Sequence, residues 1–190
     1  MTTLEREVKL RFDSVEDARA ALVTSDATPL RCRRLQEDYL LDDAAETLHH
    51  RRCVLRVRVE AGKSLVTFKG PVQVSLMKVR EELETVVGDG DTMLRCFEHL
   101  GYRVWFRYQK YREEYALGDV TIAIDETPVG VFVEVEGSEQ GITDAARALG
   151  RGPGDYVVDS YHRLFLEYCR AQGLPATDMV FDGSEAPIPR

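Results

Sequence analysis

Charged residues recur at every second position in five short segments of this 190-residue chain, with largely apolar residues between them. Side chains alternate between the two faces of a β-strand, so each segment places its charges on one face. Both signs recur at this spacing, which predicts that the charged faces converge on a solvated lumen for metal ions and a polyanion. The segments are Glu5-Arg6-Glu7-Val8-Lys9, Arg56-Val57-Arg58, Arg80 with Glu82 and Glu84, Lys110-Tyr111-Arg112, and Glu134-Val135-Glu136.

Any one of these segments, taken alone, is more often a solvated strand face than part of a site. The overall composition fits either interpretation, because 44% of the residues are hydrophobic and 31% are charged, as in a soluble globular protein. The length suits one domain with a real core. The formal net charge of -8 argues against a general nucleic-acid binder, although a basic interior face could still hold a small polyphosphate.

The chain also lacks the sequence signals of membrane insertion and export. No apolar run approaches the roughly 20 residues that span a bilayer, and the charged segment Thr3-Leu4-Glu5-Arg6-Glu7 is unlike a signal peptide. We therefore expect a cytoplasmic protein with neither a membrane nor a nucleic acid as partner. The cysteines form no paired motif, so we expect reduced, mostly buried thiols; they are Cys32, Cys53, Cys96 and Cys169.

Four helices are predicted, largely from capping residues at their starts and glycines after their ends. The second, for example, has apolar residues at Leu94, Phe97 and Leu100 and stops at Gly101. After the last helix, the prolines and acidic residues from Leu174 onward predict a flexible tail at 174–190, following one domain at 1–173. The predicted helices run from Ser14 to Leu22, from Asp91 to Leu100, from Thr143 to Leu149 and from Ser160 to Gln172.

Eight strands are predicted between and around these helices. Glycine-containing turns at Ala61-Gly62-Lys63 and Gly118-Asp119 indicate hairpins, so the sheet is antiparallel. Eight alternating strands can close around a small ligand. The predicted fold class is α+β: a closed eight-stranded antiparallel β-barrel, or tunnel, with flanking helices. The strands are Leu4 to Phe12, Arg34 to Leu41, Cys53 to Glu60, Ser64 to Lys69, Val79 to Val87, Arg103 to Leu117, Val120 to Glu126 and Gly130 to Gly137.

The charged segments also resemble a known family. Glu5-Arg6-Glu7-Val8-Lys9 is similar to the ExExK signature that opens CYTH domains, also called triphosphate tunnel metalloenzymes, which include inorganic triphosphatases, thiamine triphosphatases and class IV adenylyl cyclases. The resemblance covers about residues 4 to 168. Its further motifs, in the family's order, are Leu55-Arg56-Val57-Arg58, Thr67-Phe68-Lys69-Gly70-Pro71, Arg80-Glu81-Glu82-Leu83-Glu84, Lys110-Tyr111-Arg112, Asp125, the run from Gly130 to Gly137, and Ser160-Tyr161.

The resemblance implies a division of labour between acids and bases. Divalent metal, Mg²⁺ or Mn²⁺, would be bound by Glu5, Glu7, Glu134 and Glu136, with Glu82, Glu84 and Asp125 contributing directly or through water. Phosphate oxygens would be bound by Lys9, Arg56, Arg58, Lys69, Lys110 and Arg112. Arg80 would either join these cations or orient Glu82 and Glu84. The residues expected to be most directly catalytic are Glu5, Glu7, Lys9, Arg56, Arg58 and Lys69.

Three activities are compatible with such a tunnel. The first is metal-dependent hydrolysis of inorganic triphosphate or a related organic triphosphate. The second is a class IV adenylyl cyclase that converts ATP to cyclic AMP and pyrophosphate, and the third is a non-catalytic polyphosphate or nucleotide binding module. The expected partner is a small-molecule triphosphate, and a homodimer is possible. In eukaryotic thiamine triphosphatases, the resemblance would place a phosphate-binding lysine in the last helix. The last predicted helix here has no lysine, only Arg163 and Arg170, which makes thiamine triphosphate a less favoured substrate.

Histidines and aromatic residues carry weaker signals. His49 and His50 lie in a predicted loop, and His99 and His162 lie on predicted helices; we expect surface or packing roles for all four. Trp105, with the neighbouring Phe106 and Tyr108, is expected to pack, although an aromatic ring near a tunnel mouth could stack on a base or thiazole ring.

Overall fold

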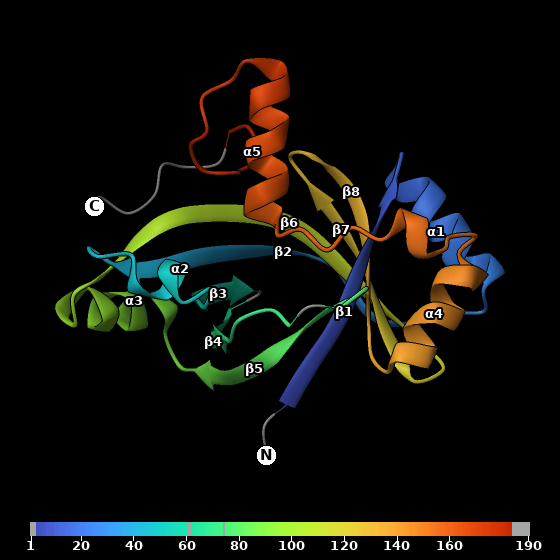
Figure 1. Cartoon of the computed structure of the whole chain (residues 1–190), viewed down its shortest axis with the longest axis horizontal. Coiled ribbons are helices and arrows are strands. Elements are labelled where there is room, and N and C mark those ends of the chain that lie inside the picture. Colours follow the sequence, from blue (N-terminus) through green and yellow to red (C-terminus); the bar gives the residue numbers. More distant parts are fainter. Residues whose placement is uncertain (1–2, 61, 74, 184–190) are drawn as a thin grey trace.

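Eight antiparallel strands close into a barrel, and helices stand around it (Figure 1). The computed structural model describes residues 3–60, 62–73 and 75–183; Ala61 of the predicted hairpin turn and residues 184–190 of the predicted tail lie outside them. The strand order is β1-β5-β4-β3-β2-β6-β7-β8, so the predicted α+β barrel is confirmed. The strands are β1 (Thr3–Phe12), β2 (Thr28–Asp43), β3 (Val54–Glu60), β4 (Lys63–Lys69), β5 (Lys78–Val87), β6 (Tyr102–Leu117), β7 (Val120–Thr127) and β8 (Gly130–Glu136).

Strand β2 begins at Thr28, six residues before the predicted start at Arg34. Its first six residues are all exposed, so they show no alternation of buried and exposed side chains that a sequence pattern could detect. Backbone pairing extends the strand instead, because this stretch runs beside the end of β6 with register shifts on either side of Arg31.

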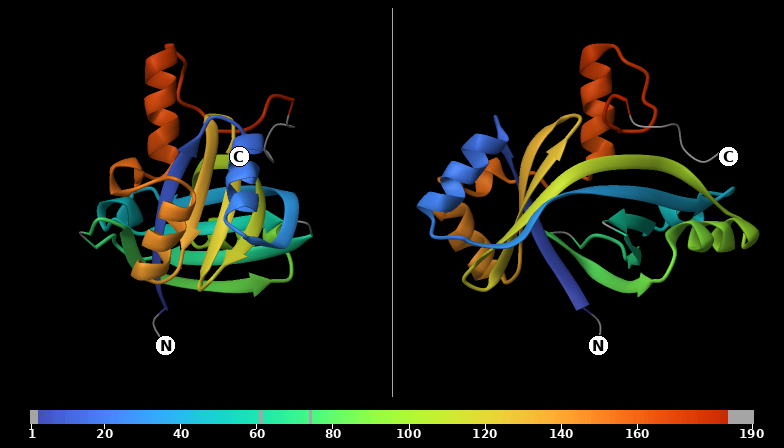
Figure 2. Two further views of the ribbon diagram at one scale, coloured as in Figure 1. Left: turned by 90° about the vertical axis from the view of Figure 1, so that its right-hand side faces the viewer. Right: turned by 180° about the vertical axis from the view of Figure 1, so that it is seen from behind.

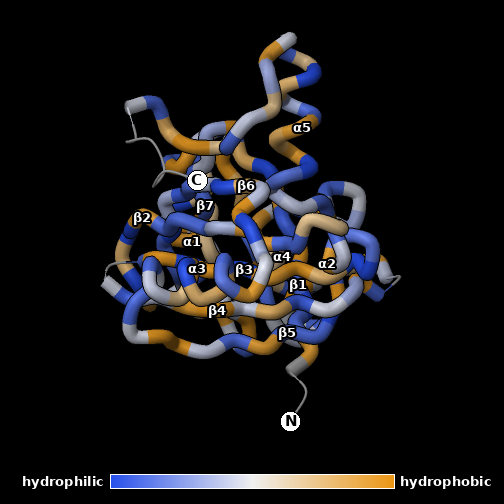
Figure 3. Tube along the Cα trace, turned by 90° about the vertical axis from the view of Figure 1, so that its left-hand side faces the viewer, coloured by the Kyte–Doolittle hydropathy of each residue, from blue (hydrophilic) through white to orange (hydrophobic). Residues whose placement is uncertain are grey.

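Alternate side chains along the strands point into the barrel and away from it. On β3, Arg56 and Arg58 line the interior cavity, whereas Val57 between them is completely buried in an apolar cluster on the outside. The tube in Figure 3 accordingly switches repeatedly between hydrophilic and hydrophobic colours along the strands. The barrel therefore has a charged interior, and its apolar cores lie outside.

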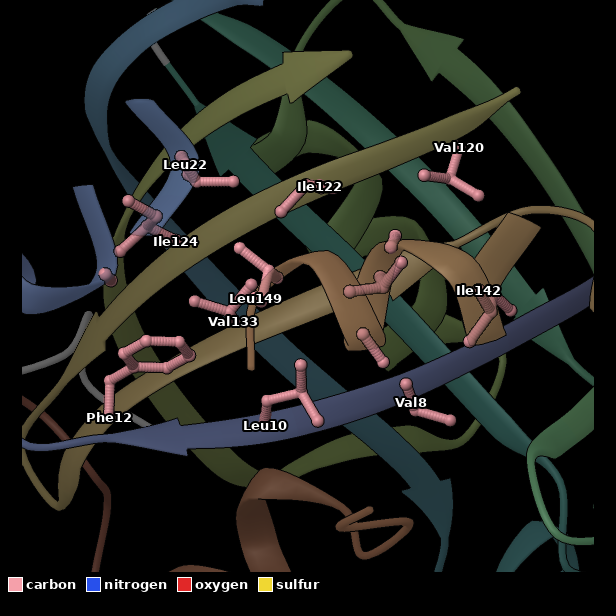
Figure 4. Packing of buried hydrophobic residues seen from close by; sticks show 14 of the residues in the cluster. Val8, Leu10, Phe12, Leu22, Val120, Ile122, Ile124, Val133, Ile142 and Leu149 are labelled. Carbon is pink, nitrogen blue, oxygen red and sulfur yellow. The ribbon is translucent and has the colours of Figure 1, made fainter. Parts of the chain in front are cut away.

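The first apolar core lies between β1, β7 and β8 and two helices, α1 (Val15–Thr24) and α4 (Glu139–Ala148). Figure 4 shows Val8 and Leu10 of β1 facing Ile142 and Leu149 at the α4 side. Both helices lie at the same end of the molecule (Figure 2). This packing holds in place the strand that carries Glu5, Glu7 and Lys9.

The cap predicted at Ser14 is confirmed, since its hydroxyl accepts the Asp17 backbone N–H at 3.0 Å. The start predicted for α4 at Thr143 is wrong. Ser138 caps this helix by accepting the Gly141 N–H at 2.9 Å, and Thr143 lies inside it with its hydroxyl donating to the Glu139 carbonyl.

Helix α3 (Gly90–His99) covers the opposite part of the barrel, where Leu94 packs with Leu41 and Val57. Its cap is Asp89 rather than the predicted Asp91: the Asp89 carboxylate accepts the Thr92 N–H at 2.6 Å. Either aspartate could cap a helix from sequence alone, and the chain path out of β5 decides between them. The histidines expected in a loop belong to a one-turn helix, α2 (Thr47–His50).

Helix α5 (Tyr161–Gln172), which follows the short 3₁₀ helix η1 (Pro153–Asp155), stands on the barrel over β2 and β6 (Figure 1). The chain after it, predicted to be loose, returns to β6. Met179 is completely buried, its N–H donates to the Arg107 carbonyl at 3.0 Å, and its carbonyl accepts the Gln109 N–H at 2.8 Å. Strand β7 pairs with β6 only from Tyr111 onward, so this segment covers a β6 edge that β7 leaves free.

Two further expectations concern cysteines and membranes. All four cysteines are free; Cys53 and Cys169 are buried as expected, and Cys32 and Cys96 are exposed. Within the described residues, no helix combines the length and the apolar character needed to cross a bilayer.

The burial of Met179 generates a stability prediction. We expect Met179→Ala to lower the free energy of unfolding by about 2–5 kcal/mol, the usual cost of emptying a buried methionine site. The melting temperature should fall by about 4 °C or more in a chain of this size. Differential scanning calorimetry measures both quantities. Leu174→Ala, at a position that is 52% exposed in the same segment, is the control and should have little effect. Equal effects of the two changes would contradict the packing role of Met179.

Candidate active site

One cavity of about 760 Å³ runs through the barrel interior, and it gathers almost every residue proposed from sequence. These side chains come from six strands, so only the closed barrel brings them together. The structure places the following predicted residues on its wall: Glu5, Glu7, Lys9, Arg56, Arg58, Lys69, Arg80, Glu82, Glu84, Lys110, Arg112, Glu134 and Glu136. Asp125 is the exception.

Asp125 lies behind two of the cations. It is completely buried on β7, where its carboxylate accepts from Lys110 Nζ at 2.7 Å and from Arg112 Nε at 2.6 Å. The Tyr161 hydroxyl at the start of α5 donates to the same carboxylate at 2.6 Å. With these donors around it, Asp125 holds the two cations in place rather than facing the cavity as a metal ligand would.

Asp38 on β2 does the same for a second pair of cations. It too is completely buried, and its carboxylate accepts from Arg58 Nε at 2.8 Å and lies 3.3 Å from Arg56 Nε. Burial alone would raise the pKa of Asp38, but the two guanidinium groups outweigh it and lower the pKa. Asp38 and Asp125 are thus fixed anions behind two pairs of cations that alternate on β3 and β6.

A third cluster of ion pairs links the middle of β1 to the neighbouring strands β5 and β8. Lys9 Nζ lies 3.1 Å from Glu7 and 3.4 Å from Glu134, and Lys78 Nζ donates to Glu7 at 2.6 Å. Burial would raise the pKa of Glu7, but Lys9 and Lys78 hold it well below its usual range. Burial also lowers the pKa of Lys78 to about 8. These groups form a compact network of alternating sign.

The acids dominate farther along β1, toward the end of the barrel away from α5. Lys69 Nζ lies between Glu5 at 2.7 Å and Glu82 at 3.0 Å. Glu136 makes no ion pair within the part of the chain that the structure describes. Partial burial and the nearby carboxylates of Glu5, Glu7 and Glu82 raise its pKa to about 7. Burial also raises the pKa of Glu5. Negative charge is therefore incompletely neutralised here.

Two arginines of the cavity wall, Arg56 and Arg80, have a buried Nε donor without a hydrogen-bond partner among the described residues. Arg80 lies opposite Glu5 in the β1–β5 register, and its Nε is 3.5 Å from the Glu5 carboxylate. We expected Arg80 to pair with Glu82 and Glu84, but its ion pair is with Glu5. Both Nε atoms nevertheless lie within ion-pair distance of a carboxylate, Asp38 for Arg56 and Glu5 for Arg80, so each guanidinium charge is balanced in the free protein.

The acid end suits a hard divalent cation in its chemistry, because its donors are all carboxylate oxygens and their mutual repulsion raises the pKa of Glu136. In the described residues, however, no three acidic, histidine or cysteine side chains are gathered closely enough to hold a metal ion. The ion pairs of Lys69 with Glu5 and Glu82 keep the carboxylates turned toward that ammonium group. The donor set fits a metal in its chemistry, and two of its members, Glu5 and Glu82, are engaged by Lys69.

Sequence reasoning missed several residues of this site. Lys78 alternates with Arg80, but it precedes the predicted start of its strand at Val79. Asp38 is the only acid on its face of the predicted strand Arg34 to Leu41, so no recurring pattern marked it. Glu60 binds Arg34 at 2.6 Å and also contacts Arg31, which belongs to the part of β2 that the pattern did not detect.

The burial of Asp38 predicts a large effect on stability. Asp38→Asn should lower the free energy of unfolding by about 3–5 kcal/mol, because it leaves the positive charges of Arg56 and Arg58 buried without their counter-ion. Urea unfolding measures the change. The matched control is Glu167→Gln, which breaks the exposed pair with Arg163 and should cost less than about 1 kcal/mol. The assignment of Asp38 fails if the two substitutions cost the same.

Comparison with known proteins gives the chain a family. A protein of Methanocaldococcus jannaschii named "putative adenylate cyclase" is 29% identical over 147 residues, which cover 77% of this chain and 83% of that protein. A solved structure with the same designation, from Vibrio parahaemolyticus, has a TM-score of 0.75 at 20% identity and covers 86% of this chain and 98% of its own. Another, from Hippeastrum, is described as having a dominant triphosphatase activity; its TM-score is 0.66 at 17% identity, with coverages of 86% and 95%. The model of the CYTH domain matches residues 3–161, and the chain therefore belongs to the CYTH family.

Proposed function

We propose that this protein is a metal-dependent triphosphatase that binds inorganic triphosphate, or a related organic triphosphate, inside its barrel and hydrolyses it to release orthophosphate. The observation that carries the proposal is the arrangement of charge in the cavity. Paired cations on β3 and β6 face the middle of the tunnel, and under-neutralised carboxylates gather nearer one end. A metal-bound triphosphate requires both kinds of group, because its phosphates bind cations and its metal binds carboxylates.

The cations act by position and charge. A triphosphate carries about four negative charges, and phosphoryl transfer is accelerated mainly by positioning and electrostatic stabilisation. Arg56 and Arg58, held by Asp38, would bind from one side, and Lys110 and Arg112, held by Asp125, from another. Their geometry is set before the ligand arrives, so little reorganisation is needed at the moment of reaction.

The acids act on the metal. Mg²⁺ or Mn²⁺ would be held by Glu5, Glu136 and Glu82, with Glu7 and Glu134 close by, and Glu84 farther along the same face of β5. Such an ion would neutralise phosphate charge and supply a water of lowered pKa as the nucleophile. In the free protein Lys69 shields Glu5 and Glu82. We propose that this ammonium group turns to the phosphate when metal and substrate enter together.

The alternative activity is cyclisation of ATP. The name of the M. jannaschii relative favours it, and the same paired cations would bind the triphosphate of ATP. The two reactions differ in which phosphorus meets the nucleophile: the terminal one for a water, and the α-phosphorus for the sugar hydroxyl. The triphosphatase described from Hippeastrum supports hydrolysis within this fold.

Product analysis separates these activities. The purified protein is incubated with tripolyphosphate and with ATP, each with Mg²⁺ or Mn²⁺. We expect orthophosphate from tripolyphosphate and no product in excess EDTA. If ATP instead yields cyclic AMP and pyrophosphate while tripolyphosphate stays intact, the protein is a cyclase and not a triphosphatase. Binding of both compounds without any product would leave only a binding module.

Glu136 provides the sharpest test of the metal assignment. Glu136→Gln keeps the shape of the side chain and removes its charge, and it strands no cation, because Glu136 has no ion pair among the described residues. We expect Mn²⁺ affinity, measured by calorimetry without substrate, to fall at least tenfold to a hundredfold, the range that loss of even an outer-sphere partner produces. The melting temperature should stay within about 2 °C of the parent.

The control is Glu139→Gln, three residues later on the exposed start of α4. It should change neither Mn²⁺ affinity nor turnover. Unchanged Mn²⁺ binding in Glu136→Gln would remove Glu136 from the metal site.

A further inference from the structure

Tyr161, the first residue of α5, reaches from its helix into the wall of the cavity, where its side chain is buried. Its hydroxyl binds Asp125 on β7, and its ring meets the Phe132 ring of β8 edge-on at 5.6 Å. The ring centroid also lies 5.3 Å from Lys9 Nζ on β1 and 4.9 Å from Lys110 Nζ on β6. One side chain from a helix outside the barrel therefore contacts residues of four strands.

The chain before α5 fixes the position of Tyr161 relative to β1. Strand β1 pairs with β5 only as far as Glu7, and Val157 pairs with the edge that β5 leaves free at Lys9. The Val157 N–H donates to the Lys9 carbonyl at 2.9 Å, and the Val157 carbonyl accepts the Lys9 N–H at 3.0 Å. Ser160 then caps the helix with its hydroxyl. The start of α5 is thus attached to the strand that carries Lys9.

The Tyr161 hydroxyl is a neutral donor to a carboxylate that otherwise binds cations. Because a carboxylate only accepts hydrogen bonds, the phenol donates to Asp125 Oδ2, at 2.6 Å. The same oxygen accepts from Lys110 Nζ at 2.7 Å and from Arg112 Nη2 at 2.5 Å. Burial and the nearby carboxylates hold the pKa of Tyr161 well above its usual range, so the phenol keeps its proton. It occupies part of this oxygen without adding a positive charge, and Lys110 therefore has only a share of it.

The Tyr161 ring acts on the same lysine and on a second one. Lys9 and Lys110 both place their ammonium groups over the ring, at distances where the negative face of an aromatic ring attracts a cation. Both lysines are almost completely buried, so water does little to screen this attraction. A ring attracts an ammonium group without accepting a conventional hydrogen bond from it. It therefore stabilises the two charges and leaves their N–H groups to other acceptors.

We propose that Tyr161 is a positioning residue that keeps Lys9 and Lys110 available to phosphate oxygens in the cavity. Its hydroxyl limits how closely Asp125 binds Lys110, and its ring stabilises both ammonium groups where they face the cavity. Without the hydroxyl, Lys110 would move onto the vacated side of Asp125 and away from a ligand. The inference rests on the proposed triphosphate site and adds to it a neutral residue that acts through two cations. It also makes the attachment of α5 part of the binding site.

A double-mutant cycle with Lys110 tests this role. Tyr161→Phe removes only the hydroxyl, and calorimetry with tripolyphosphate and Ca²⁺ measures binding independently of turnover. We expect the Kd to rise about threefold to thirtyfold, within the range that coupled residues of one network show. In a Lys110→Met background the same change should alter the Kd less than about twofold, because the lysine through which the hydroxyl acts is gone. Lys110→Gln replaces Lys110→Met if that variant does not fold.

Tyr161→Leu tests the ring. This change removes the aromatic face as well as the hydroxyl, and we expect it to weaken tripolyphosphate binding at least about threefold beyond Tyr161→Phe, in line with the strength of buried cation–π contacts. Melting temperatures of the two variants show whether both are folded at the temperature of the titration. Equal affinities of folded Phe and Leu variants would contradict the part assigned to the ring.

Tyr115→Phe is the matched control. Tyr115 also belongs to β6 and site-like chemistry surrounds it, since its hydroxyl donates to the Glu113 carboxylate at 3.3 Å, but it is not part of the cavity wall. Its replacement should leave tripolyphosphate affinity unchanged. An unchanged Kd in Tyr161→Phe, or an equal loss with and without Lys110, would overturn the positioning role and leave the triphosphate site standing. If the parent protein binds no tripolyphosphate, the proposed function fails as well.

Discussion

The constraint on which this structure depends is that charges removed from water must be neutralised where they lie. The barrel interior contains lysines and arginines that are almost completely buried, among them Lys9 and Lys110 at 2% exposure. Each is matched by a carboxylate from a neighbouring strand. Because the interior is occupied by ion pairs, the apolar cores that stabilise the fold lie outside the barrel, under α1, α3, α4 and α5. The helices are therefore a requirement of the charged lumen.

The acids inside the barrel fall into two physical groups. Asp38 and Asp125 have no exposed surface, and each accepts from two or more donors, so removing either would strand charges that water cannot reach. Glu5 and Glu136 lie among further carboxylates with few bases to neutralise them, and the pKa of each is raised. Under the proposed function, the permanent anions would keep phosphate-binding cations in position, and the under-neutralised anions would bind a divalent cation. The same residue type thus serves positioning in one place and ligand binding in another.

Alternation predicted the strands of the barrel and most of the cavity residues, because both signs of charge recur on one face of several strands, whereas Lys69 and Asp125 were proposed only from the family resemblance. Alternation does not reveal features that depend on how the strands pair with one another. The early part of β2 is a strand because β6 lies beside it, and its exposed side chains carry no periodic signal. Asp125 matched a motif, but only the fold reveals that Lys110, Arg112 and Tyr161 surround it. Met179 likewise looked like part of a loose tail, and the edge that it covers is visible only in three dimensions.

The two ends of the tunnel together bear on which reaction the site favours. The cations in its middle can bind any triphosphate, so they do not discriminate between hydrolysis and cyclisation. The under-neutralised acids lie near Glu5, and the tunnel mouth lined by Trp105 and His162 lies beyond the cations along the tunnel. An organic triphosphate that lay along the cations with its organic group at this mouth would have its terminal phosphorus nearest the acids, where a water activated by a bound metal would attack. Cyclisation needs the α-phosphorus, next to the sugar, in that same environment. The separation of rings from carboxylates therefore favours hydrolysis of the terminal phosphate.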